Sequence, residues 1–71
     1  DYETALVIVN RMRLFAPDEP RLLFDQGVLQ AKLGNIREAI TTLESFIAVS
    51  QDRSTIQDAR AFLAALKSGL N

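Results

Sequence analysis

Carboxylates are the side chains of this sequence that could do chemistry together. Those that could act as a general acid and base, or hold a cation, are Asp25, Glu38, Glu44 and Asp58. The 71 residues include no His and no Cys, which removes the commonest general base, thiolate nucleophiles, zinc-thiolate sites and disulfides. A helix cap or a solvated helix face explains each of the four carboxylates equally well. The sequence therefore predicts no enzyme, no metal site and no cofactor.

Composition excludes several other classes of partner. Eight basic and nine acidic residues are interspersed, so no stretch carries the concentrated positive charge that nucleic acid or an anionic membrane requires. No apolar run approaches the ~20 residues of a membrane span, and no secretory pattern is present. Gly27 and Gly34 lack the Lys-Ser/Thr pair and the strand context of a phosphate loop. We expect a cytoplasmic protein that binds neither nucleic acid nor membrane.

The elements that position these residues are predicted to be helices. Apolar residues recur at steps of three and four in four segments, at about residues 2–16, 18–33, 36–50 and 54–68. Pro17 should end the first, because it pushes Ala16 out of the helical region, and Gly34 should end the second in a left-handed conformation. The expected N-caps are Asp1, Asp18, Asn35 and Ser54. No stretch alternates with period two, so the fold class is all-α, with antiparallel helical hairpins.

The chain repeats itself when its first half is laid over its second. In this alignment Ala5 matches Ala39 and Gly27 matches Ala61. Further aligned pairs are Tyr2 with Ile36, Val9 with Leu43, and Met12 with Phe46. The first and third helices are therefore copies, and the second and fourth are a weaker pair of copies. Two helices in a period of about 34 residues indicate a helical solenoid.

The spacing Gly27-x11-Ala39-x3-Leu43-x2-Phe46 resembles one unit of the tetratricopeptide repeat (TPR) family. The resemblance implies a single TPR-like domain over residues 1–71. In it, residues 18–51 form a complete repeat, residues 1–17 form helix B of a partial repeat, and residues 54–69 form a closing helix. Small residues then let paired backbones approach closely, and the positions that fill this role are Ala5, Gly27, Ala39 and Ala61. The departures from the family pattern are Leu23, Gln30 and Gln51.

A narrower resemblance concerns the run from Asp18 to Leu33 followed by Ala39-x3-Leu43-Glu44-x-Phe46. It is similar to the helical tail behind a transglutaminase-like domain in a family of bacterial proteins. This resemblance implies a bacterial source and places any enzyme-like chemistry upstream of the chain. The sequence begins at Asp1 without an initiator Met, so we expect a fragment of a longer protein.

The TPR resemblance also implies a concave face, lined by the second and fourth helices, where a protein or peptide partner binds. The residues expected on it are Arg21, Phe24, Val28, Ala31, Lys32, Asp58, Phe62, Ala65 and Leu66. This surface is apolar with a charged fringe, which favours an apolar helix or extended segment over a terminal carboxylate. The alternative is that Phe24 and Phe62 only pack on each other and on intramolecular neighbours.

The first helix carries the main anomaly of the sequence. Ala5–Val9 is apolar all round, whereas its copy contains Thr41 and Thr42. Since a helix that is apolar on every side is buried on every side, the flank formed by Leu6, Val7 and Ile8 needs a cover. We expect an upstream domain to cover it, or a second copy in a homodimer of the isolated fragment.

The predicted function is a non-catalytic TPR-type interaction or scaffolding module that packs against an upstream domain. Two alternatives stay open. One is a homo-oligomerisation module that acts through the first helix. The other is a helical appendage of an upstream transglutaminase-like or protease-like domain.

Overall fold

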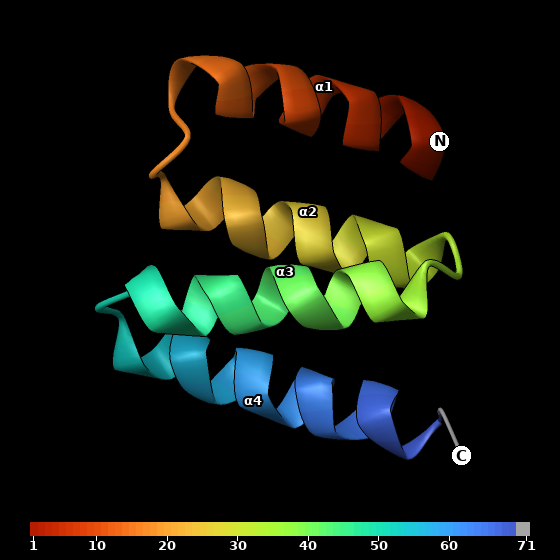
Figure 1. The fold of residues 1–71 in the computed structure, drawn as a ribbon, viewed down its shortest axis with the longest axis vertical. Helices are drawn as coiled ribbons and strands as arrows, with labels where there is room; N and C mark the ends of the chain where they lie inside the picture. The colour runs from red at the N-terminus through yellow and green to blue at the C-terminus, as the bar shows by residue number, and fades with distance from the viewer. Residues whose placement is uncertain (70–71) are drawn as a thin grey trace.

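The computed structural model describes residues 1–69, which form four α-helices and no strand. The helices are α1 (Tyr2–Phe15), α2 (Pro20–Lys32), α3 (Ile36–Val49) and α4 (Arg53–Ser68). They run antiparallel and lie side by side in chain order, with α1 and α4 at the two ends of the row (Figure 1). The longest dimension, 35 Å, runs across this row rather than along a helix. The predicted all-α fold of helical hairpins is therefore confirmed.

Proline and extended backbone end α1 and α3. Ala16, which precedes Pro17, has φ −138° and ψ 66°, so α1 ends at Phe15 rather than at the predicted residue 16. Ser50 is extended, with φ −75° and ψ 147°, and α3 ends one residue earlier than predicted. At the start of α1 the Asp1 carboxylate accepts the Thr4 N–H at 3.1 Å, as expected of an N-cap.

The predicted N-caps of α2 and α4 were wrong. Glu19, not Asp18, caps α2, and its carboxylate accepts the Arg21 N–H at 3.3 Å. The cap falls there because the helix begins at Pro20, whose fixed φ and missing N–H suit the first helical position. Asp52 caps α4 in place of Ser54, whose N–H it accepts at 3.2 Å. The two helices therefore begin at residues 20 and 53 rather than at 18 and 54.

The turn between α2 and α3 closes as the sequence predicts. Gly34 has φ +83°, the left-handed region that a residue with a Cβ seldom adopts. Its N–H donates to the Ala31 carbonyl at 3.1 Å, and the Asn35 N–H donates to the Gln30 carbonyl at 2.9 Å. Asn35 is the N-cap of α3, although its side chain makes no capping hydrogen bond.

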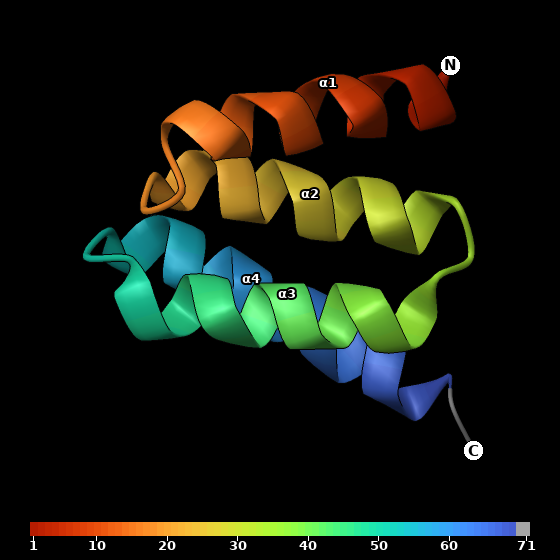
Figure 2. The ribbon, with the colours of Figure 1, turned by 45° about the horizontal axis from the view of Figure 1, so that its top comes forward.

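The core joins α2, α3 and α4. Leu23, Phe46 and Ala59, one from each helix, form a buried cluster. The half-buried side chains around the cluster are Phe24, Ile47 and Ile56. The rings of Phe24 and Phe46 lie 5.2 Å apart at an angle of 53°, a favourable tilted geometry. In both views α4 passes beside α3, so one cluster can bridge the three helices (Figure 2).

Gly27 lets the Leu43 side chain of α3 pack closely on α2. A Cβ on Gly27 would lie 2.7 Å from both Cγ and Cδ2 of Leu43, closer than side chains pack. The TPR resemblance implied that the small residues Gly27 of α2 and Ala39 of α3 face each other. Ala39 is fully buried, but the side-chain atoms nearest to Gly27 belong to Leu43.

Polar side chains contribute to the contact between α1 and α2. Arg13 Nη1 donates to Gln26 Oε1 at 2.7 Å, and Gln26 Nε2 donates to Asn10 Oδ1 at 3.1 Å. Val9, next to Asn10 on α1, and Leu22, one helical turn before Gln26 on α2, are both buried apolar residues. One side of α1 is thus covered by α2.

Candidate functional site

An exposed apolar stripe runs along α1. Ile8, Met12 and Phe15 are 52%, 49% and 90% exposed, and their spacing of four and three residues places them on one side of the helix. We call these three residues the outer face of α1. Since α1 is an end helix with only α2 beside it, no helix within residues 1–69 covers this face (Figure 1).

The structure places the predicted flank partly on this face. Val7 and Ile8 are exposed, whereas Leu6 is half-buried. Sequence reasoning missed Met12 and Phe15 as members of an exposed surface. The alignment of Met12 with Phe46 held the signal, because it places Met12 where α3 contacts its preceding helix.

The same face of α3 is covered. In the alignment of the two copies, Ile8 corresponds to Thr42 and Met12 to Phe46. Phe46 is only 2% exposed, because it packs between Leu23 and Phe24 of α2 and Ala59 of α4. Thr42 donates a hydrogen bond at 2.7 Å to Oε1 of Gln30, which is buried on α2. Two copies of one helix therefore differ in whether a preceding helix covers them.

The opposite end of the row has a different character. In the alignment of the two copies, the residues of α2 that face α3 correspond to four residues of α4. All four are exposed: Gln57, Asp58, Ala61 and Ala64. Ala61, which was expected to pack closely, is therefore on the surface. Such a small and polar outer surface is typical of a terminal helix that ends a repeat array. The apolar surface of α1 is not.

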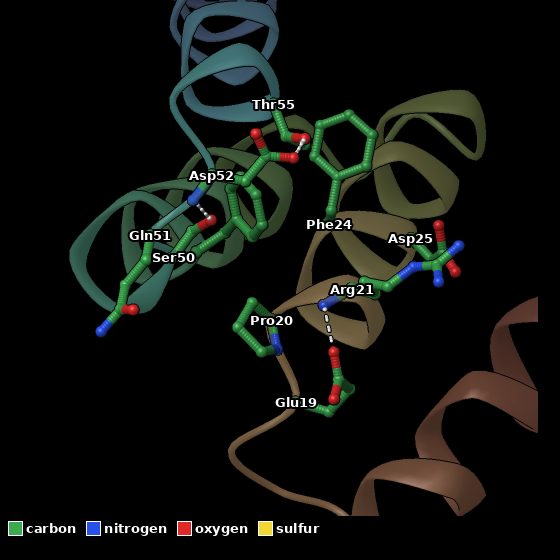
Figure 3. A pocket seen from close by; sticks show the side chains of 10 residues that line it. Glu19, Pro20, Arg21, Phe24, Asp25, Ser50, Gln51, Asp52 and Thr55 are labelled. Carbon is green, nitrogen blue, oxygen red and sulfur yellow. Dashed lines mark hydrogen bonds between the residues drawn. The ribbon is translucent and has the colours of Figure 1, made fainter.

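A cavity of about 580 Å³ lies where α2 begins, α3 ends and α4 begins (Figure 3). Its walls include Arg21 and Phe24 from the predicted concave surface. The lining residues that sequence reasoning missed are Glu19, Pro20, Asp25, Phe46, Ser50, Gln51, Asp52 and Thr55. These come from helix ends that only the folded chain brings together, and we know of no sequence signal for that juxtaposition.

The remaining residues of the predicted concave surface do not join this cavity. Val28, Phe62 and Leu66 are half-buried and Asp58 is exposed. The Lys32 ammonium lies 5.4 Å from the centre of the Tyr2 ring, so this side chain lies against α1. The ring partner of Phe24 is Phe46 of α3.

The carboxylates considered for catalysis lie in separate places. Asp25 lines the cavity, and Glu38 lines a second, shallower hollow of about 340 Å³. Glu44 pairs with Lys67 at 3.1 Å, and Asp58 is exposed. Across residues 1–69 no three His, Cys, Asp or Glu side chains gather as metal ligands do.

Among the carboxylates of residues 1–69, Asp52 has a pKa that the structure clearly shifts. The hydrogen bond from the Thr55 hydroxyl, helped by the N–H groups of Ser54 and Thr55, lowers the pKa of Asp52 below its ordinary value. The shift belongs to the cap of α4. It stabilises the ionised cap rather than preparing a proton transfer.

The four antiparallel helices define a small solenoid of helical hairpins. The profile of the tetratricopeptide repeat family matches residues 1–64, and the chain belongs to that family. Tetratricopeptide repeats generally bind proteins or peptides and are generally not catalytic. No match to the chain is found among curated proteins or among solved structures. None of the helices in residues 1–69 has the length and apolarity to cross a membrane.

Proposed function

We propose that this chain is a non-catalytic interaction module whose outer face of α1 packs against an apolar helix of an adjoining, upstream domain. One observation carries the proposal. Met12 is 49% exposed, whereas its copy Phe46, which packs between α2 and α4, is 2% exposed. This repeat position is therefore buried by neighbouring helices in the second copy. In the first copy, no helix of residues 1–69 covers it.

Burial of this face would supply useful binding energy. Full burial of an exposed Ile, Met or Phe side chain contributes about 1.5–3 kcal/mol. Because Ile8 and Met12 are half-exposed and Phe15 is nearly fully exposed, the three together offer roughly 3–6 kcal/mol. That is enough to hold a domain that is already tethered in the same polypeptide, where the cost of association is small.

Two finer assignments follow from the same proposal. The run Asp18–Leu33 resembles the tail of transglutaminase-like proteins, which supports a domain of that kind as the one adjoining α1. The cavity beside Phe24 has room for a side chain of a further protein or peptide, which supports the same class of function. The competing function is homo-oligomerisation through the outer face of α1.

Cysteine labelling tests the proposal directly, because the sequence contains no other Cys. Phe15→Cys reports on the outer face, and Leu14→Cys, at a position 80% exposed on another side of α1, is its matched control. In the natural protein we expect Phe15→Cys to react with maleimide several-fold more slowly than in the isolated 71-residue chain. Leu14→Cys should react equally fast in both.

The labelling rates also separate the rival. Equal rates for Phe15→Cys in the natural protein and in the isolated chain would show that nothing covers the outer face. Protection that appears in the isolated chain and grows with its concentration would instead support homo-oligomerisation, and light scattering would then detect the dimer.

A further inference from the structure

The cavity where α2 begins, α3 ends and α4 begins combines an aromatic inner wall with an acidic rim. Phe46 is the most deeply buried of its lining residues, and Phe24 and Pro20 are half-buried. Three carboxylates of the lining are exposed and lie toward the solvent: Glu19, Asp25 and Asp52 (Figure 3). The cavity is therefore apolar inside and charged at its opening.

The rim carries a net negative charge. Arg21 is the single cation among the lining residues, all of which lie within residues 1–69. Glu19 and Asp52 are the N-caps of α2 and α4, so the partial positive charge of a helix N-terminus offsets part of their charge. Asp25 lies beyond the first turn of α2 and caps no helix. Its carboxylate is therefore the one best placed to meet a cation from outside.

An arginine side chain matches both parts of the cavity. Its planar guanidinium stacks on aromatic rings and donates several N–H groups to carboxylates, while its aliphatic stem covers apolar surface. The ammonium of lysine is more strongly hydrated and has no flat face to stack. A volume of about 580 Å³ lies within the usual range of ligand sites. A carboxylate or phosphate ligand would be repelled by the rim.

We propose that this cavity binds an arginine side chain of a partner protein, with the guanidinium against Phe24 and the carboxylate of Asp25. The inference goes beyond the packing of α1 on an upstream domain, because it names the chemistry of a partner at a second surface. No lining residue of the cavity belongs to α1. The two proposals can therefore fail separately.

Arg21 competes with the incoming arginine. It is exposed and lies four residues before Asp25, a spacing at which two side chains of a helix can meet. Pairs of this kind on an exposed helix surface are weak. A bound guanidinium that contacts a ring as well as the carboxylate can displace Arg21. Removal of this native cation should therefore strengthen binding.

The probe is a tripeptide with arginine between two alanines, blocked at both ends and titrated into the isotope-labelled 71-residue chain. We expect the backbone amide NMR signals of Asp25, Asp52 and Thr55 to shift. A tripeptide with citrulline, which has nearly the shape of arginine but no charge, should bind about fivefold more weakly. The lysine tripeptide should bind about threefold more weakly.

Variants of the chain locate the charge that matters. Asp25→Asn should weaken the arginine tripeptide about threefold, and Arg21→Gln should strengthen it by a similar factor. Glu38→Gln, an equal change in charge outside the cavity, should leave binding unchanged and is the matched control. All three residues are exposed, and circular dichroism verifies that the variants remain folded.

Several results would overturn the inference. They are the absence of shifts at about 10 mM arginine tripeptide, shifts confined to residues outside the cavity, and equal binding of the citrulline tripeptide. An equal effect of Asp25→Asn and Glu38→Gln would also overturn it, because net charge rather than the cavity would then act. Equal binding of the lysine tripeptide would refute the assignment to arginine. The cysteine labelling of α1 decides the proposed function independently.

Discussion

Replacement of Gly27 by alanine should destabilise the protein, although alanine is the better helix former. Within α2 the exchange gains about 0.5–1 kcal/mol from backbone entropy. The new Cβ would lie 2.7 Å from Cγ and Cδ2 of Leu43, a side chain that is fully buried. Overpacking of this kind costs about 1–3 kcal/mol. The net loss should be about 1 kcal/mol.

The matched control is Ala61→Gly at the corresponding position of α4. Ala61 is exposed, so this change should lose only the helix propensity, about 0.5–1 kcal/mol. Both variants are measured by urea unfolding followed at 222 nm and by thermal melts, where 1 kcal/mol shifts the midpoint of a domain of this size by roughly 4–8 °C.

The sign of the stability change in Gly27→Ala decides whether packing or helix propensity dominates at this position. If Gly27→Ala raises the unfolding free energy by the amount that Ala61→Gly lowers it, only propensity acts at both sites. The contact with Leu43 would then not set the distance between α2 and α3.

Three further predictions concern packing, polar burial and capping. Phe46→Ala should cost about 3–5 kcal/mol and largely unfold the chain, whereas Phe15→Ala should stay within about 0.5 kcal/mol of the wild type, both by urea unfolding. Thr42→Val should lower the unfolding free energy by about 1–3 kcal/mol, because it leaves the Gln30 oxygen without its donor. Adding Gln30→Leu should recover much of this loss, and additive losses in the double variant would contradict the buried pair. Asp52→Ala should lower the melting temperature at neutral pH. The folded-state pKa of Asp52 lies below its ordinary value of 3.8, so its contribution to stability is present above that pH and is lost as the pH falls further. A difference from wild type that does not shrink as the pH is lowered below 3.8 would contradict this origin.

The sequence by itself determined the number of helices, their order and most of their ends. Pro17 and Gly34 act through their own backbone chemistry, so their effect needs no tertiary context. The periodic apolar residues and the internal repeat then specify a row of paired helices. The caps of α2 and α4 were missed because several adjacent polar residues could reach the same N–H groups, and only the observed path of the loop distinguishes them.

Tertiary structure alone decided which copies of a repeated position are covered. Met12 and Phe46 occupy the same place in the repeat, yet one is half-exposed and the other buried. Gly27 and Ala61 likewise correspond, but only Gly27 faces another helix. The spacing of apolar residues shows which faces of a helix can pack, because it depends only on the sequence of that helix. Coverage depends on whether a neighbour is present, and that is a property of the assembled row of helices.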